Sequence, residues 1–272
     1  ATTPRRPAPP PQRRSPALPA PQRIRAATQA PTPAGPTARD PCNTPGYPPP
    51  ADTNATQKAE AQAADVVELG IPFSDPMADG MTIQRSSFEA LKKGVSLKWI
   101  FDQLDAAGDI DTPLVMMSYL NPLLAFGYEA LAERALAAGV CGFIVPDLPF
   151  EESGELRAAL EAHGLGLVQL VTPATPEDRL QTLCEASRGF VYAVTITGIT
   201  GGGAGLPADL ADYLDKVSGM SKIPVCAGFG IRSAQDVAAV GQHASGAIVG
   251  SALVEVLEKN EDPGRFLGSL FG

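Results

Sequence analysis

The sequence predicts an α/β barrel, in which parallel strands alternate with helices. From residue 65 onward, short apolar runs alternate with Ala- and Leu-rich amphipathic stretches, the pattern of strands joined by crossover helices. Some runs, such as Pro224–Ala227, are apolar throughout, as strands covered on both faces are. Glycine-rich turns close the last two runs, where a barrel commonly builds a phosphate site. A doubly wound open sheet is the competing architecture.

Seven runs are predicted to be strands, and the stretches between most of them to be helices. The strands are expected at Val66–Leu69, Pro113–Tyr119, Gly142–Val145, Leu167–Val171, Phe190–Val194, Pro224–Ala227 and Ala247–Val249. Helices are expected at Tyr128–Ala138, Ser153–His163, Pro176–Ser187, Leu206–Ser218 and Ser233–Gly241.

An eight-stranded barrel needs one more strand before Val66, and none is recognisable. Residues 40–50 contain five prolines, and a proline cannot donate to a central β-ladder. Thr53–Ala64 is predicted to form the first helix of the barrel. The predicted fold is therefore a (βα)8 barrel, or TIM barrel, whose first strand is missing or unrecognisable.

Residues 1–50 are predicted to lie outside the fold, and residues 51–272 to form the barrel domain. The first segment holds sixteen of the 27 prolines, seven arginines and no acidic residue before Asp40. An Arg-containing, acid-free N-terminus resembles an organelle transit segment, which implies a plastid (chloroplast stroma) location. The proline content equally fits a disordered linker, which leaves the cytoplasm as the location.

Composition excludes several classes of protein. All 30 acidic residues follow Arg39, so the barrel domain is strongly acidic, which argues against nucleic acid and anionic membrane surfaces as partners. No apolar run reaches membrane-spanning length. The four cysteines form no C-x-x-C pair, and the two histidines show no metal-ligand spacing, so no metal site is predicted.

Three carboxylates within twelve residues suggest proton chemistry. Glu68 lies near the end of an apolar strand, where an ion is costly to bury without a partner, a raised pKa or a function. Asp75 and Asp79 follow on a loop that Pro72 and Pro76 stiffen. An ordinary turn whose Asp residues cap the next helix is the alternative interpretation.

Three glycine clusters follow strands. Gly228–Ile231 and Gly246–Ser251 let the backbone approach a phosphate, and a helix start offers free N–H groups. Tight βα turns are the alternative for both. The cluster at Gly198–Gly205 suits a lid that closes over a ligand, or else a linker.

Together these segments resemble the α subunit of tryptophan synthase, from residue 65 to about residue 270. The strongest match is Glu68–Gln84. Further matches, in the order of the family, are Ser118–Pro122, Val145–Pro149, Gly198–Gly201, Gly228–Ile231 and Gly250–Ser251.

The resemblance implies a lyase that cleaves indole-3-glycerol phosphate to indole and glyceraldehyde 3-phosphate, a retro-aldol reaction without a cofactor in this chain. It implies that Glu68 is the general acid/base and that Asp79 accepts the indole N–H hydrogen bond. Tyr192 matches an active-site tyrosine near Glu68. Thr200 matches a lid threonine. The matches to phosphate-binding groups are Gly201, Phe229, Gly230, Gly250 and Ser251.

The resemblance also implies a partner. In the family a β subunit carrying pyridoxal phosphate joins the indole to serine, in an α2β2 complex, and Pro72, Asp75 and Asn121 match surfaces that meet it. A stand-alone indole-3-glycerol-phosphate lyase is a close alternative. An inactive, truncated barrel that only binds a partner is another.

Overall fold

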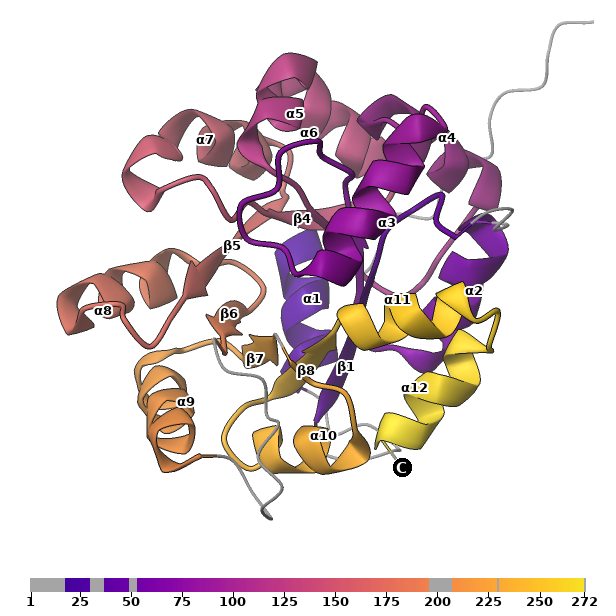
Figure 1. The fold of residues 1–272 in the computed structure, drawn as a ribbon. Coiled ribbons are helices and arrows are strands. Elements are labelled where there is room, and N and C mark those ends of the chain that lie inside the picture. Colours follow the sequence, from indigo (N-terminus) through magenta and orange to yellow (C-terminus); the bar gives the residue numbers. More distant parts are fainter. Residues whose placement is uncertain (1–17, 30–36, 49–52, 196–206, 229, 272) are drawn as a thin grey trace, which may run out of the picture.

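Eight parallel strands close into one barrel in the computed structural model, which describes residues 18–29, 37–48, 53–195, 207–228 and 230–271 (Figure 1). Each strand pairs with the next in sequence, and the last pairs with the first. The predicted barrel is confirmed over an open sheet. The strands are β1 (Ala38–Asn43), β2 (Val67–Gly70), β3 (Leu114–Met117), β4 (Val140–Ile144), β5 (Gly166–Val171), β6 (Val191–Val194), β7 (Val225–Gly228) and β8 (Gly246–Val249).

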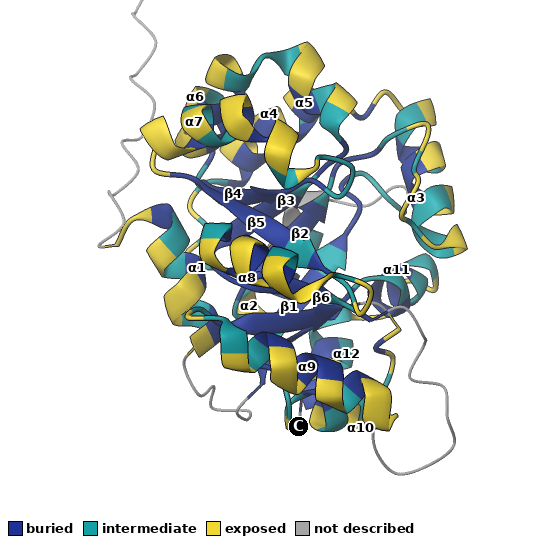
Figure 2. Ribbon diagram, turned by 90° about the vertical axis from the view of Figure 1, so that its left-hand side faces the viewer, coloured by how far each residue is buried: buried dark blue, intermediate teal, exposed yellow. Residues whose placement is uncertain are grey.

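Helices surround the strands, and their outer faces are exposed while the strands are buried (Figure 2). Every residue of β4 is buried, because one face of the strand lines the barrel interior and the other packs on helices. The helices are α1 (Ala20–Gln29), α2 (Thr53–Ala63), α3 (Met81–Lys92), α4 (Leu97–Ala107), α5 (Leu120–Phe126), α6 (Tyr128–Ala137), α7 (Gly154–Ala162), α8 (Glu177–Ala186), α9 (Ala208–Met220), α10 (Ala234–Val240), α11 (Ser251–Glu258) and α12 (Pro263–Phe271), with a short 3₁₀ turn, η1 (Phe150–Glu152).

The first strand exists, and its predicted absence was wrong. β1 pairs with β8 from Ala38 to Pro41 and with β2 only at Cys42 and Asn43. Alternate residues of a parallel strand bond to opposite neighbours, so Pro41 faces β2 together with Arg39. The pairing of β1 with β2 begins one residue later, at Cys42. The backbone N–H that Pro41 lacks is therefore not needed for a hydrogen bond between these two strands. α2 then follows, as predicted for the first helix.

Residues 20–29 also belong to the fold, which corrects the prediction for residues 1–50. α1 packs against β4 and β1 at the amino end of the barrel (Figure 1). Its Ile24 is fully buried, and a Cβ added at Gly189 (φ +97°) would lie 3.0 Å from it. The predicted transit-like segment otherwise lies mostly outside the described residues.

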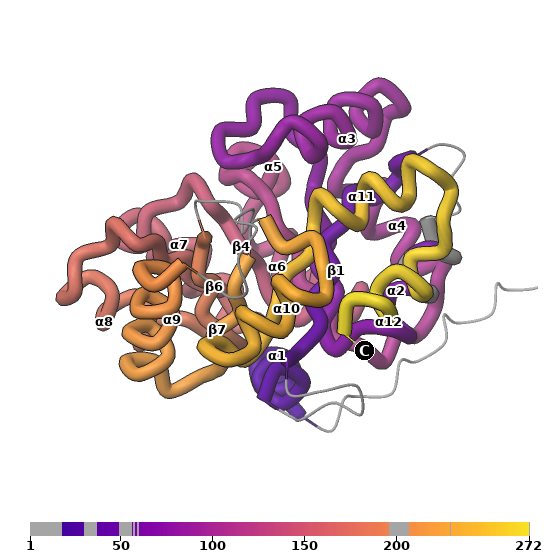
Figure 3. The backbone as a smooth tube through the Cα atoms, turned by 60° about the horizontal axis from the view of Figure 1, so that its bottom comes forward, coloured from indigo at the N-terminus to yellow at the C-terminus, as the bar shows by residue number. Residues whose placement is uncertain are grey.

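The two ends of the barrel sequence meet on one side. The C-terminal helix α12 packs beside α2, and α11 packs beside α3 (Figure 3). α11 begins shortly after β8, and α3 begins where the loop after β2 ends. This packing holds the glycine turn of β8 next to the acidic loop, from opposite ends of the sequence.

We predict that Ile24→Ala lowers the free energy of unfolding by about 2–4 kcal/mol, because it opens a cavity under the barrel. Urea unfolding of the full chain measures this. The control is Gln22→Ala on the exposed face of the same helix. Equal stability of both variants would show that α1 is not part of the folded core.

Candidate active site

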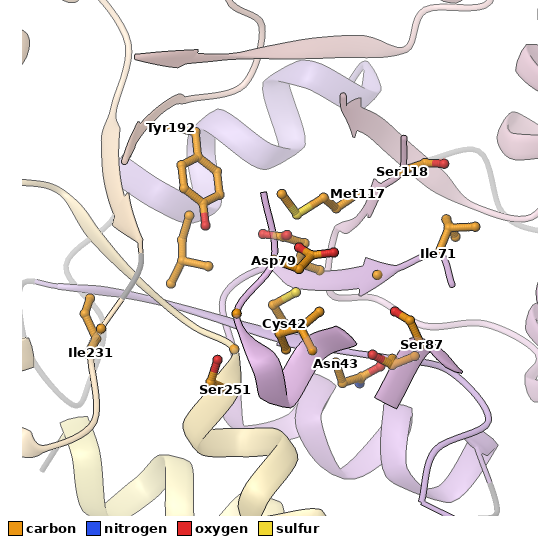
Figure 4. Close-up of a pocket in the computed structure, with 18 of the residues that line it drawn as sticks. Cys42, Asn43, Ile71, Asp79, Ser87, Met117, Ser118, Tyr192, Ile231 and Ser251 are labelled. Carbon is orange, nitrogen blue, oxygen red and sulfur yellow. The ribbon is translucent and has the colours of Figure 1, made fainter. Parts of the chain in front are cut away.

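A cavity opens at the carboxyl ends of the strands, the face on which barrels carry their active sites (Figure 4). Both carboxylates singled out from the sequence, Glu68 and Asp79, line it. Residues at the strand ends complete the wall, among them Asn43, Gly70, Met117, Tyr192, Ile231 and Gly250. The site therefore combines residues from six different strands or their following loops.

Glu68 lies on β2, opposite Cys42 on β1 and Val115 on β3. Its side chain is fully buried, and neither carboxylate oxygen has a hydrogen-bond partner among the described residues. The pKa of Glu68 is raised to about 7, with burial as the largest cause. The nearby Cys42 thiol lowers the pKa in part, and the Asp79 carboxylate adds to the rise. Both protonation states are therefore accessible near neutral pH.

Asp79 lies on the loop between β2 and α3 and is only partly buried. Burial raises its pKa, and the Tyr119 hydroxyl opposes this shift. Glu68 is the more deeply buried of the two carboxyl groups, so the two lie in unlike environments. Two carboxyl groups in unlike environments can take unlike roles in one reaction.

Three contacts hold the loop that carries Asp79. The backbone N–H of Ala78 donates to the Tyr119 hydroxyl at 2.9 Å, and the Phe73 ring stacks on Tyr119 with centroids 5.2 Å apart. The Gln84 side chain donates to the Asp79 carbonyl at 2.8 Å. The loop that its prolines were predicted to stiffen is therefore also held by Tyr119, which lies between β3 and α5, and by Gln84 of α3.

Tyr192 of β6 is buried and lines the same cavity, as predicted. Burial raises its pKa well above the usual range, and the Glu68 carboxylate raises it further. A Cβ at Gly228 on the neighbouring β7 would lie 2.3 Å from the Tyr192 hydroxyl oxygen. Glycine at 228 is thus the residue that leaves room for the tyrosine.

The described residues that were predicted to bind a phosphate lie at one end of the cavity. Gly230 (φ +86°) follows β7, and Gly250 and Ser251 join β8 to α11. These are the seventh and eighth strands, as the sequence analysis expected. Ser251 is the first residue of α11, so the open N–H groups of the first helical turn lie beside it. The predicted sites Thr200, Gly201 and Phe229 lie outside the described residues.

The three predicted partner residues differ in exposure. Asp75 and Asn121 are exposed near the cavity mouth, on the loop after β2 and on α5. Pro72 is buried within the chain, so the structure does not bring its side chain to a partner surface.

The contribution of β1 to the cavity was not predicted, because no strand before β2 is recognisable in the sequence. Cys42 and Asn43 line the cavity. Asp40 is fully buried below them, and neither of its carboxylate oxygens has a partner among the described residues. Burial raises its pKa well above the usual range, and Glu68 and then Asp65 raise it further. The count of seven predicted strands was the one signal that another strand was needed.

A third buried acid lies behind the cavity wall. Glu60 of α2 is fully buried and accepts a hydrogen bond from the Asn43 side chain, while its other oxygen has no partner among the described residues. Burial raises the pKa of Glu60 to about 8, against the opposing effect of Asn43. At neutral pH this carboxyl group is therefore mostly protonated.

Within the described part of the chain, no group of three or more His, Cys, Asp or Glu side chains could hold a metal ion. No described helix is long and apolar enough to cross a membrane.

The sequence profile described as tryptophan synthase alpha chain matches residues 41–266. The chain belongs to this family. A tryptophan synthase alpha chain from Roseiflexus sp. (strain RS-1) is 42% identical over 236 residues, which are 86% of this chain and 90% of the relative. Another, from Carboxydothermus hydrogenoformans, is 43% identical over 199 residues, 73% of this chain and 74% of the relative.

The fold agrees with solved structures. A chain from a structure of the tryptophan synthase a2b2 complex of the hyperthermophile Pyrococcus furiosus superposes with a TM-score of 0.78 at 35% identity. The superposition covers 86% of this chain and 96% of that one. Family membership identifies the chain as an alpha chain of tryptophan biosynthesis and a lyase, and does not favour a stand-alone lyase or an inactive barrel. The curated relatives named above are bacterial and give no support to a plastid location.

We predict that Glu60→Gln flattens the pH dependence of stability. The native state binds a proton at Glu60 that the unfolded state releases near pH 4.5, so wild-type stability falls as pH rises from 4.5 to about 8. In that window the free energy of unfolding of the variant should rise, relative to that of the wild type, by at most about 1.4 kcal/mol per pH unit.

Urea unfolding at several pH values measures the effect, with Glu133→Gln on the exposed face of α6 as the control. A constant difference between wild type and Glu60→Gln from pH 5 to pH 8 would contradict the assignment.

Proposed function

We propose that the chain cleaves indole-3-glycerol phosphate to indole and glyceraldehyde 3-phosphate. The observation that carries this proposal is the single cavity that Glu68, Asp79 and the start of α11 line together. In this proposal the indole ring binds beside the two carboxylates, and the phosphate binds at the helix start, where free N–H groups favour an anion. Family membership supports the same class of reaction.

Glu68 moves the protons in this proposal. Carbon 3 of the indole must gain a proton, and the glycerol hydroxyl must lose one before the carbon–carbon bond breaks. A carboxyl group with a pKa of about 7 can serve as acid and as base at neutral pH. Because the two transfers have opposite directions, Glu68 ends the cycle in its starting state.

Asp79 stabilises the charge that forms on the ring. Protonation at carbon 3 makes the indole nitrogen electron-poor, and a carboxylate that accepts the N–H hydrogen bond offsets the charge. The contacts of its loop with Tyr119 and Gln84 hold Asp79 in place before the substrate binds. Tyr192 fills the wall beside Glu68 and contributes to the dry environment of the acid.

The other substrate and cofactor assignments follow the family. Gly230, Gly250 and Ser251 are proposed to bind the phosphate together with Gly201 and Phe229, and Thr200 is proposed to help close the site. No cofactor is proposed for this chain. We also propose a cytoplasmic location, with which the bacterial relatives are consistent.

A β subunit carrying pyridoxal phosphate is the proposed partner, in an α2β2 complex that receives the indole. Large apolar side chains are exposed on the segments that follow β2 and β3, namely the loop before α3, α3 itself and α5: Met77, Met81, Phe88 and Leu124. Exposed apolar side chains gathered on one face are typical of protein interfaces. The tryptophan synthase a2b2 complex of Pyrococcus furiosus provides a precedent in a related chain.

We predict that Glu68→Gln lowers kcat for indole release at least 100-fold, because the acid/base is lost. Asp79→Asn should lower kcat about 10- to 100-fold, since an amide cannot offset the ring charge as a carboxylate does. Asp75→Asn, exposed on the same loop, is the control and should retain activity when assayed without a partner. Activity of Glu68→Gln within tenfold of wild type would refute the assigned mechanism.

We predict that Leu124→Glu abolishes the stimulation of indole release by an added tryptophan synthase β subunit, because a charge in an apolar interface is costly. The basal rate should not change. Leu136→Glu is the matched control, since Leu136 is also exposed but lies near the end of α6, at the amino end of the barrel. Equal stimulation of both variants would place the partner surface elsewhere.

A further inference from the structure

The cavity contains a charge imbalance that the proposed function leaves open. The proposed substrate carries a negatively charged phosphate, yet the described residues that line the cavity include the acidic Glu68 and Asp79. Among the described residues that line the cavity, Arg232 is the only basic one. A cation at the wall of an acidic cavity is a candidate partner for a dianion.

Arg232 lies next to the groups proposed to bind the phosphate. It follows Gly230 and Ile231 on the turn after β7, and it lines the cavity together with Gly250 and Ser251. Its backbone is fixed, because its N–H donates to the Asp236 carboxylate at 2.9 Å, within the capping box that starts α10. The side chain is half-exposed and can therefore change partner without rebuilding the turn.

The Arg232 guanidinium currently bonds to Glu255 of α11. Glu255 lies four residues after Ser251, so both are on the same face of the helix, one turn apart. Helical side chains lean toward the helix N-terminus, which brings the Glu255 carboxylate over the first turn. The ion pair thus holds the guanidinium at the helix start, where the phosphate is proposed to bind.

We propose that Arg232 is a phosphate-binding residue, which exchanges Glu255 for the phosphate of the substrate. The inference rests on the proposed function and deepens it. A guanidinium can bond two phosphate oxygens at once, whereas the exposed pair with Glu255 contributes little to stability. Glu255 then has a defined role: it holds Arg232 at the start of α11 until the phosphate binds, and it competes with the phosphate.

This exchange predicts opposite effects of the two partners. Arg232→Gln should weaken binding of inorganic phosphate about tenfold or more, because the charged donor is lost. Glu255→Gln should strengthen it severalfold, because the competitor and its repulsion are removed. Arg232→Lys should retain part of the affinity, since it keeps the charge but loses the fork.

Calorimetric titration of the full chain with inorganic phosphate measures these affinities without requiring catalysis. The matched control is Arg85→Gln, because Arg85 forms a similar pair with Glu258 of the same helix and does not line the cavity. Its phosphate affinity should stay within twofold of wild type. The inference is overturned if Arg232→Gln also stays within twofold, or if Arg232→Gln and Glu255→Gln shift the affinity in the same direction.

Steady-state kinetics separate this inference from the proposed function. With indole-3-glycerol phosphate, Arg232→Gln should raise KM about tenfold with kcat within threefold of wild type. Wild-type kinetics in that variant would overturn the role of Arg232 while leaving the lyase intact. A wild-type chain that binds phosphate through Arg232 but cleaves no substrate would overturn the lyase alone.

Discussion

The burial of Glu68 without a hydrogen-bond partner is the constraint on which the rest of the site depends. A carboxylate in the mouth of a closed barrel loses its hydration, and nothing among the described residues replaces it. The neutral form is therefore favoured, and the pKa rises to about 7. A carboxyl group that would be fully ionised on the protein surface can here act both as an acid and as a base at neutral pH. The fold thus creates the reactivity of Glu68 through what surrounds it.

The closure of the barrel keeps that environment dry. β1 pairs with both β2 and β8, and its Cys42 lies directly opposite Glu68. The same closure buries Asp40, and burial raises the pKa of its carboxyl group as well, with Glu68 and then Asp65 adding to the rise. Buried carboxyl groups that must stay protonated cost stability as pH rises. The site and the pH dependence of stability therefore have one physical origin.

The sequence was sufficient where local chemistry and pattern agree. Apolar runs predicted the positions of β2 to β8. The end of the β2 run also predicted a functional position for Glu68 and for the following loop, which carries Asp79. The sequence was insufficient for β1, because local propensity argues against a strand that contains Pro41. The structure tolerates this proline because β1 does not yet pair with β2 at residue 41, so no N–H is needed there. The burial of Ile24 and Pro72 and the Asn43–Glu60 contact arise only from tertiary packing, which no local pattern encodes.

The most direct test of this account is the protonation state of Glu68 in the folded chain. Infrared difference spectra recorded across a pH titration, with Glu68→Gln identifying the carboxyl band, report that state without substrate or partner. The account predicts a protonated carboxyl band that disappears with a midpoint near pH 7. A Glu68 band that is already absent at pH 5.5 would contradict it, because the carboxylate would then be solvated or paired, and burial could not be the source of its reactivity.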